Sequence, residues 1–211
     1  LRLDPDFLPA RNNLAVLLSA TGRSSEAEKL LRETLDLARR QRARAAEAAA
    51  ELPGVKQQRA ETTDANRAGE LDVRIAALEM RNREVRELEH LIGQLHFSLG
   101  MLAAENPRRL DEAEKELAAA AALLPLRPRV RYNWGLALNQ LGRTAEAEEQ
   151  LKQALAMVPD ETDFLYALAT FYAEHGRWRD ALPYAEQLLR RRPDWPDASQ
   201  LLQRIRRALR E

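Results

Sequence analysis

Cysteine is absent from this chain of 211 residues. Its absence excludes disulfide bonds, iron–sulfur clusters and zinc sites built on thiolates. It leaves the redox compartment undecided, because a protein without thiols has no need of either a reducing or an oxidising environment.

Long apolar runs are also lacking, since no stretch approaches the ~18 residues that a membrane-spanning helix needs. We therefore expect no membrane insertion. No secretory signal peptide is visible, and the chain opens on "LRLDPDF", which is typical of a helix end and its stop. We interpret the sequence as a fragment of a longer protein whose targeting region is missing, so cytoplasmic and periplasmic locations both stay open.

No excess of one charge exists, because 33 basic residues balance 33 acidic ones. A balanced chain creates no overall field that attracts nucleic acid or an anionic membrane. We therefore favour neither as a partner.

Motifs that carry catalysis or bind metals are missing too. The sequence contains no HExxH, CxxC, GxGxxG, GxxxxGK[ST] or GxSxG. Of the three histidines, His90 and His96 are six residues apart, which puts them on different sides of a helix, and His175 precedes a glycine. The sequence predicts no enzyme activity, no cofactor and no metal site.

The sequence does contain a motif that recurs every 34 residues. "NWGLALNQLGRTAEAEEQL" at 133–151, moved forward by 34, falls on "ALATFYAEHGRWRDALPYAEQL". Copies in the same register occur as "NNLAVLLSATGRSSEAEKLL" near the start of the chain and, less regularly, as "HFSLGMLAAENPRRLDEAEKEL". Four features recur. A large-then-small pair occurs at Leu14-Ala15, Leu99-Gly100, Trp134-Gly135 and Leu168-Ala169, and a Gly-Arg pair occurs at Gly22-Arg23, Gly142-Arg143 and Gly176-Arg177. An alanine recurs at Ala27, Ala113, Ala147 and Ala181, and a proline at Pro125, Pro159 and Pro193.

This pattern resembles the tetratricopeptide repeat. The resemblance implies an all-α solenoid in which each unit is an antiparallel pair, helix A and helix B, that buries its face on the next unit. It also explains Gly135, a residue that costs roughly 1 kcal/mol in a helix interior. At that position the resemblance implies the closest approach of helix A to helix B, so Gly135 is interpreted as a packing residue and not as part of a phosphate loop.

The register leaves about 51 extra residues between the first and second repeats. There the sequence continues as "LDLARRQRARAAEAAAEL", stops at Pro53-Gly54, and resumes a helical pattern near Glu70. We predict a long helical hairpin or coiled coil inserted at 38–92, between a first repeat at 1–37 and a second at 93–127. The third and fourth repeats take 128–195, and a capping helix takes 196–211. The predicted helices are 10–20/24–50, 70–104/109–124, 128–141/144–157, 162–175/178–191 and 196–210.

The two arms of the predicted hairpin carry unequal apolar surface. The second arm has Val73, Ile75, Leu78, Met80, Val85, Leu88 and Leu91, whereas the first arm offers mainly alanine and Leu52. Either residues 55–68 fold back as a third helix, or another chain covers the remainder. We predict a possible homodimer through 71–92, with the folded-back tip as its alternative.

In tetratricopeptide solenoids the concave face is built from helix A, and the resemblance carries this face onto nine candidate peptide-binding residues. They are Asn12, Asn13, Phe97, Tyr132, Asn133, Asn139, Gln140, Tyr166 and Thr170. Their amides suit a peptide backbone and their aromatic faces suit side chains. The family's best-known ligand mode is a lysine–asparagine–arginine clamp on a terminal carboxylate, but all four lysines here lie outside helix A, which argues against it.

The functional hypothesis is a protein-interaction scaffold that binds a peptide or protein partner on its concave face. Two alternatives stay open. One is an assembly module that oligomerises through the hairpin. The other is the docking tail of a larger bacterial enzyme, because the opening "LDPDFLPARNNLAVL" also resembles C-terminal tails of some bacterial multihaem cytochromes, which would be periplasmic.

The C-terminal segment carries seven arginines. They are Arg190, Arg191, Arg192, Arg204, Arg206, Arg207 and Arg210. A capping helix needs a polar outer face, so we expect these side chains to solvate the end of the array, with an anionic partner as the alternative.

Overall fold

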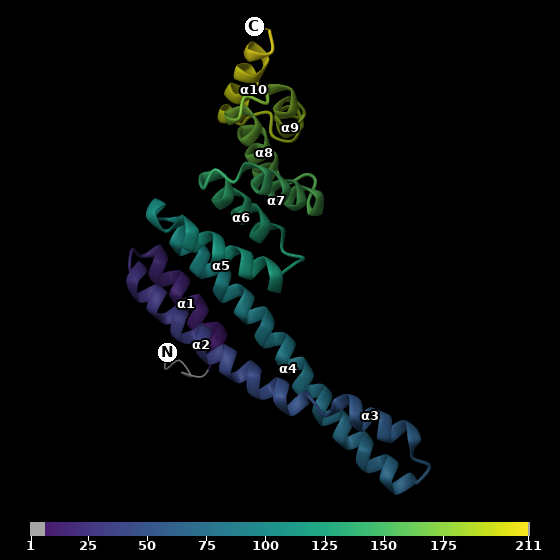
Figure 1. The fold of residues 1–211 in the computed structure, drawn as a ribbon. Coiled ribbons are helices and arrows are strands. Elements are labelled where there is room, and N and C mark those ends of the chain that lie inside the picture. The colour runs from purple at the N-terminus through teal and green to yellow at the C-terminus, as the bar shows by residue number, and fades with distance from the viewer. Residues whose placement is uncertain (1–6, 211) are drawn as a thin grey trace. The chain divides into compact units, whose positions relative to one another are not determined.

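The computed structural model describes residues 7–210, and every regular element in that range is helical. The elements are α1 (Leu8–Ala20), α2 (Ser24–Ala49), α3 (Leu52–Glu61), α4 (Ala65–Ala104), the short 3₁₀ helix η1 (Pro107–Arg109), α5 (Leu110–Leu123), α6 (Pro128–Gln140), α7 (Thr144–Met157), α8 (Thr162–Glu174), α9 (Trp178–Arg191) and α10 (Pro196–Ala208). They fall into two compact units, Leu1–Leu102 and Ala103–Glu211, which are called unit 1 and unit 2 below. Figure 1 labels the helices in each unit. The all-α solenoid class predicted from the sequence is confirmed.

The turn between paired helices has the same construction in both units. Gly22, Gly142 and Gly176 have φ values of 77°, 73° and 68°, in the left-handed region that glycine adopts without steric cost. The arginine that follows each glycine donates its backbone N–H five residues back, as Arg143 does to the Leu138 carbonyl at 2.9 Å. This is the Schellman pattern, and it satisfies carbonyls that the helix end leaves without partners. The Gly-Arg repeat in the sequence therefore encodes the stop of helix A.

The side chain of the same arginine then stabilises the start of helix B. Arg23, Arg143 and Arg177 each form an ion pair with an acidic residue three positions on, at 2.6, 2.6 and 2.7 Å. An acidic side chain in the first turn also interacts favourably with the positive end of the helix dipole. One dipeptide thus ends one helix and helps to begin the next.

In unit 1 the chain from α2 through α3 lies antiparallel to α4. Ion pairs join Arg42 to Glu89 at 2.6 Å, Lys56 to Glu79 at 2.8 Å, and Arg59 to Asp72 at 2.7 Å. As the residue numbers rise from Arg42 to Arg59 along α2 and α3, the numbers of their partners fall from Glu89 to Asp72 along α4. The two segments therefore run in opposite directions. Figure 1 shows α3 lying beside the first part of α4.

The helix α3 differs from the expectation that the first arm ends at Pro53-Gly54. Proline at the second position of a helix is well tolerated, because the N–H it lacks would have no partner there. The chain therefore bends at Ala50-Glu51 and continues as a helix to Glu61, so that Pro53 lies in the first turn of α3 and not at a stop. Whether residues 38–92 form an insertion between two repeats stays a prediction.

Most of the apolar surface on which the homodimer prediction depended is buried within the chain. Leu52 and Val55 of α3 are buried, and so are Val85, Leu88 and Leu91 of α4. Ile75 and Leu78 are half-buried, and only Val73 and Met80, exposed by 73% and 62%, remain open. The chain therefore covers more of this surface than the alanine-rich first arm suggested, and α3 lies beside Asp72 and Glu79 in the first part of α4. The homodimer itself stays a prediction.

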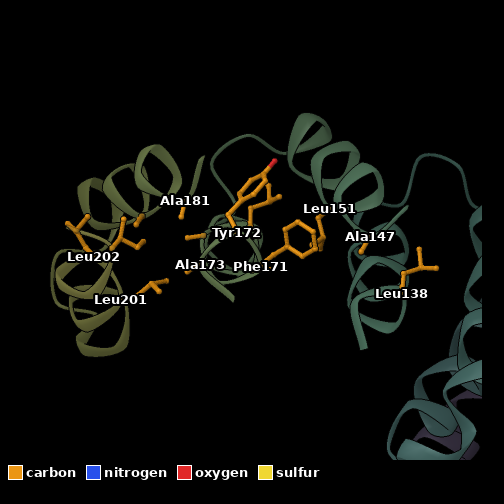
Figure 2. Close-up of a cluster of buried hydrophobic side chains, with 14 residues drawn as sticks. Leu138, Ala147, Leu151, Phe171, Tyr172, Ala173, Ala181, Leu201 and Leu202 are labelled. Atoms are coloured by element: carbon orange, nitrogen blue, oxygen red, sulfur yellow. The ribbon is translucent and has the colours of Figure 1, made fainter. Parts of the chain in front are cut away.

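Unit 2 repeats its helices at a fixed interval. α6, α8 and α10 begin at residues 128, 162 and 196, and α7 and α9 begin at 144 and 178, so equivalent helices start 34 residues apart. The core between them is made of leucine, alanine and aromatic side chains. Figure 2 shows Leu138 and Leu151 from α6 and α7, Phe171 from α8, and Leu201 and Leu202 from α10 in this cluster.

Gly135 of α6 lies at the closest contact with α7. A Cβ atom built on it would lie 2.8 Å from Leu151 Cγ, 3.0 Å from Leu151 Cδ2 and 3.2 Å from the Ala147 carbonyl oxygen. The packing interpretation of Gly135 is confirmed, with Leu151 as its nearest neighbour and the backbone of Ala147 behind it.

We predict that Gly135→Ala destabilises the chain by about 1–3 kcal/mol, because an added methyl group overpacks this contact. Gly69→Ala is the matched control. Gly69 also lies inside a helix, but a Cβ there would meet nothing within 4 Å. The control substitution should stabilise by up to ~1 kcal/mol through helix propensity alone. Thermal unfolding followed by circular dichroism measures both, and a Gly135→Ala protein at least as stable as the parent would contradict the packing role.

A partly buried polar contact joins α7, α8 and the turn before α9. Tyr172 Oη donates to Glu148 Oε1 at 2.8 Å, the Arg177 guanidinium also bonds to Glu148, and Arg177 Cζ lies 4.5 Å from the centre of the Tyr172 ring. Burial by itself would raise the pKa of Glu148, but the hydrogen bonds from Arg177 and Tyr172 outweigh it and hold that pKa below its ordinary value.

A depressed pKa makes this contact sensitive to acid. The unfolded chain binds a proton at Glu148 more readily than the folded chain, so the stabilisation is present above pH ~5 and is lost as the pH falls through the lower folded pKa. We predict that Glu148→Gln lowers the melting temperature at pH 7 and that the difference from the parent shrinks between about pH 5 and pH 3. Glu149→Gln is the control and should leave the melting curve unchanged across this range, because the exposed side chain of Glu149 bonds, within residues 7–210, only to Gln153. A difference at Glu148 that is constant with pH would contradict the assignment.

Candidate peptide-binding groove

The inner face of unit 2 is formed by α6, α8 and α10, whose equivalent positions are 34 residues apart. Tyr132 of α6 corresponds to Tyr166 of α8 and to Gln200 of α10, and Leu136 corresponds to Thr170 and Arg204. The three helices therefore present side chains in matching rows, as stacked repeats do.

Two hollows lie along this face. The first, of about 330 Å³, lies between α6 and α8, and the second, of about 460 Å³, lies between α8 and α10. The first is lined by Tyr132, Leu136, Asn139, Gln140, Leu151, Tyr166, Ala167, Thr170, Phe171 and Glu174. The second is lined by Tyr166, Thr170, Glu174, Asp197, Gln200, Leu201 and Arg204. Because both share Tyr166, Thr170 and Glu174, which are four residues apart on one face of α8, they form one continuous depression, called the inner groove below.

Two tyrosines stand at the same level of the inner groove, and each is fixed by a neighbouring ring. Tyr132 stacks on Phe164 at 4.9 Å between ring centres, and Tyr166 stacks on Trp195 at 5.0 Å. Among the residues that the structure describes, neither hydroxyl has a hydrogen-bond partner. Burial and the nearby Asp163 raise the pKa of Tyr132 against the opposing effect of Arg129, so its hydroxyl stays protonated near neutral pH and can donate. These side chains are held in place while their polar ends stay available.

Amide and hydroxyl groups lie further along the same depression. Asn139 Nδ2 is 3.4 Å from Glu174 Oε2, and the amide of Gln140 is exposed and without a partner in the described part of the chain. Thr170 Oγ1 is buried and has no hydrogen-bond partner within residues 7–210. A threonine in a helix usually bonds to a carbonyl of the preceding turn, so an unsatisfied hydroxyl here is unusual.

Five of the nine candidate residues meet in the inner groove. They are Tyr132, Asn139, Gln140, Tyr166 and Thr170. Asn133 lines neither hollow, and its amide nitrogen donates to the Arg129 carbonyl one turn back, at 2.8 Å. Neither Asn133 nor Tyr166 is fully buried.

The other three candidates lie in unit 1. Ser98 Oγ donates to Asn12 Oδ1 at 3.0 Å, which joins α1 to α4, while Asn13 is exposed and Phe97 is half-buried. Whether these three residues bind a partner stays a prediction.

The sequence interpretation missed the contribution of α10, which was expected only to solvate the end of the array. Asp197, Gln200 and Arg204 line the second hollow. The signal was present, because Gln200 and Arg204 lie 34 residues after Tyr166 and Thr170, so α10 has the register of a helix A.

Several of the C-terminal arginines have partners within the chain. Arg191 pairs with Asp160 at 2.5 Å and Arg206 with Glu186 at 2.9 Å, while Arg192 lies over Trp195 and Arg204 over Trp178, at 4.8 and 5.9 Å from the ring centres. These contacts favour the packing and solvation interpretation of the arginines over a surface for an anionic partner.

The part of the chain that the structure describes, residues 7–210, offers neither a metal site nor a membrane span. No group of histidine, aspartate and glutamate in this range could hold a metal ion. Within the same range, no helix combines the length and the hydropathy needed to cross a bilayer.

The fold and the groove together define a helical-repeat protein with a lined inner face. Three tetratricopeptide repeat models match, at residues 10–40, 102–162 and 138–205. The chain is a tetratricopeptide repeat protein.

Two of the similar solved structures, those with TM-scores above 0.5, share this fold. One is the crystal structure of the APC/C hetero-tetramer Cut9–Hcn1, which is 19% identical with a TM-score of 0.51; the match covers 96% of this chain and 37% of that one. Another is PilF of Pseudomonas aeruginosa, which is 18% identical with a TM-score of 0.51 and covers 96% of this chain and 84% of that one. YrrB, described as a tetratricopeptide repeat protein with an unusual peptide-binding site, is 20% identical with a TM-score of 0.48 over 90% of this chain and 89% of its own. No curated protein matches the chain by sequence.

Proposed function

We propose that this chain is a non-catalytic interaction scaffold that binds an extended segment of a partner protein in the inner groove. The observation that carries the proposal is the row of polar groups without partners beside fixed aromatic rings. Tyr132, Gln140 and Tyr166 each present to one depression a polar group that has no partner within the described residues. An extended peptide has an amide donor and a carbonyl acceptor at every residue, and it can satisfy such a row.

The dimensions of the inner groove suit a short segment. Three helices packed about 9 Å apart span about 18–20 Å. An extended chain rises about 3.3 Å per residue, so about six residues cross the face. Two hollows of about 330 and 460 Å³ can each accept a side chain of that segment.

The alternative of an enzyme docking tail is compatible with the same groove, because docking is also binding to a protein surface. Nothing in the inner groove favours oligomerisation through the hairpin as the main function. Binding of a partner protein in the inner groove is therefore the function we propose ahead of these two alternatives.

The first test selects ligands from a phage-displayed library of random peptides of about eight residues, a length chosen to exceed the groove slightly. Each selected peptide is then labelled and titrated by fluorescence anisotropy. We predict that Asn139→Ala and Tyr166→Phe each weaken binding about three- to tenfold, since each removes one hydrogen-bonding group and leaves the fold intact.

Asn133→Ala is the matched control, because Asn133 is on the same helix but bonds to its own backbone. It should leave the affinity within about twofold of the parent. Peptides that bind both Asn139→Ala and Tyr166→Phe as tightly as the parent would show that the inner groove is not their site, and failure to select any peptide would count against the proposed function as a whole.

A further inference from the structure

The inner groove carries a carboxylate that the repeat framework does not explain. Glu174 is the last residue of α8 and lines both hollows. At the equivalent positions of α6 and α10 stand Gln140 and Ala208, which are uncharged. A negative side chain at the C-terminal end of a helix adds to the negative end of the helix dipole, so this position costs stability and does not contribute it.

Glu174 is also without a cationic partner. In unit 2, Glu146, Glu148, Asp160, Asp163, Asp180 and Glu186 all form ion pairs with arginine. Glu174 forms none within the described residues, and its only contact is the weak one with the Asn139 amide, at 3.4 Å. That amide orients the carboxylate without neutralising it.

The charges around the second hollow add to the same negative character. Asp197, in the first turn of α10, has no ion-pair partner among residues 7–210. Arg204 is the one cation that lines this hollow, and its guanidinium lies over the Trp178 ring with no carboxylate within ion-pairing distance. Two carboxylates and one guanidinium leave the lining of the inner groove with one net negative charge.

We infer that the segment bound in the inner groove presents a lysine or arginine to Glu174. The inference rests on the proposed function and specifies its ligand: a partner segment with a basic side chain near its centre. The aliphatic part of such a side chain can lie along Leu136 and the Tyr166 ring, which line the hollows beside Glu174, while its charged end reaches the carboxylate. Charge complementarity of this kind selects among partners more than it adds affinity.

The test uses three mixtures of labelled peptides of about eight residues, random except at one central position. That position is fixed as lysine, as norleucine, which has a similar hydrocarbon chain without the charge, or as glutamate. The parent chain should bind the lysine mixture about three- to fivefold more tightly than the norleucine mixture at low salt, as fits an exposed ion pair. This preference should shrink as salt is added.

Two substitutions locate the preference. Glu174→Gln should bind the lysine and norleucine mixtures equally, and Glu174→Lys should prefer the glutamate mixture. Glu149→Gln, a matched loss of one carboxylate on α7 outside the groove lining, should keep the parent's preference for lysine. Circular dichroism of each variant checks that the helices are retained.

The outcomes separate this inference from the function on which it rests. If the parent binds all three mixtures equally and Tyr166→Phe weakens each of them, the inner groove binds peptides without a basic preference and the inference is overturned. If Glu174→Gln keeps the lysine preference, Glu174 is not its source and the inference is likewise overturned. If the parent binds none of the mixtures, the proposed function fails and the inference fails with it.

Discussion

The close approach of paired helices is the constraint on which the rest of unit 2 depends. Gly135 leaves no side chain between α6 and α7, so that Leu151 fits directly against the backbone. A larger residue would push α7 away from α6 and, through Leu151, disturb the cluster that α8 shares with both. In a repeat array each helix pair contacts only the neighbouring pairs. A change in the spacing of one pair therefore alters the spacing of the rows of side chains on the inner face. The geometry of the inner groove thus depends on a contact behind it, at a residue that does not line the groove.

The sequence predicted the repeats well because their boundaries are encoded locally. The Gly-Arg pair fixes the end of helix A through a left-handed backbone and the start of helix B through an ion pair, so the predicted pairs 128–141/144–157 and 162–175/178–191 match α6 to α9 within one residue. The hairpin was harder, because Pro53-Gly54 fits both a helix stop and the first turn of a new helix. Only the tertiary burial of Leu52 and Val55 against α4 decides between these, and a single sequence does not show it.

For the candidate site, too, helical periodicity predicts part of the residue set, and side-chain packing determines the rest. Helical spacing correctly placed Tyr132, Asn139, Gln140, Tyr166 and Thr170 on one face. It also put Asn133 there, whereas the structure places Asn133 outside the lining of both hollows with its amide nitrogen bonded to the Arg129 carbonyl, which spacing cannot show. Whether Asn133 binds a partner stays a prediction. The role of α10 was missed because amphipathic helices at the end of an array look alike whether they only cover the core or also line a groove.

Polar side chains in unit 2 thus belong to two populations that their sequence does not distinguish. On the helix B side and at the turns, arginines and carboxylates neutralise each other, as Arg177 does with Glu148 and Asp180. Along the inner groove, within residues 7–210, the hydroxyls of Tyr132, Tyr166 and Thr170 have no hydrogen-bond partner, and the Glu174 carboxylate has no cationic one. An unsatisfied polar group costs free energy when water is excluded from it, and a stable fold keeps few of them. Only the Thr170 hydroxyl is shielded from water here, whereas the exposed Glu174 carboxylate and the half-buried tyrosines can be solvated until a partner replaces that water. These groups therefore cost the fold little and suit the binding surface proposed above.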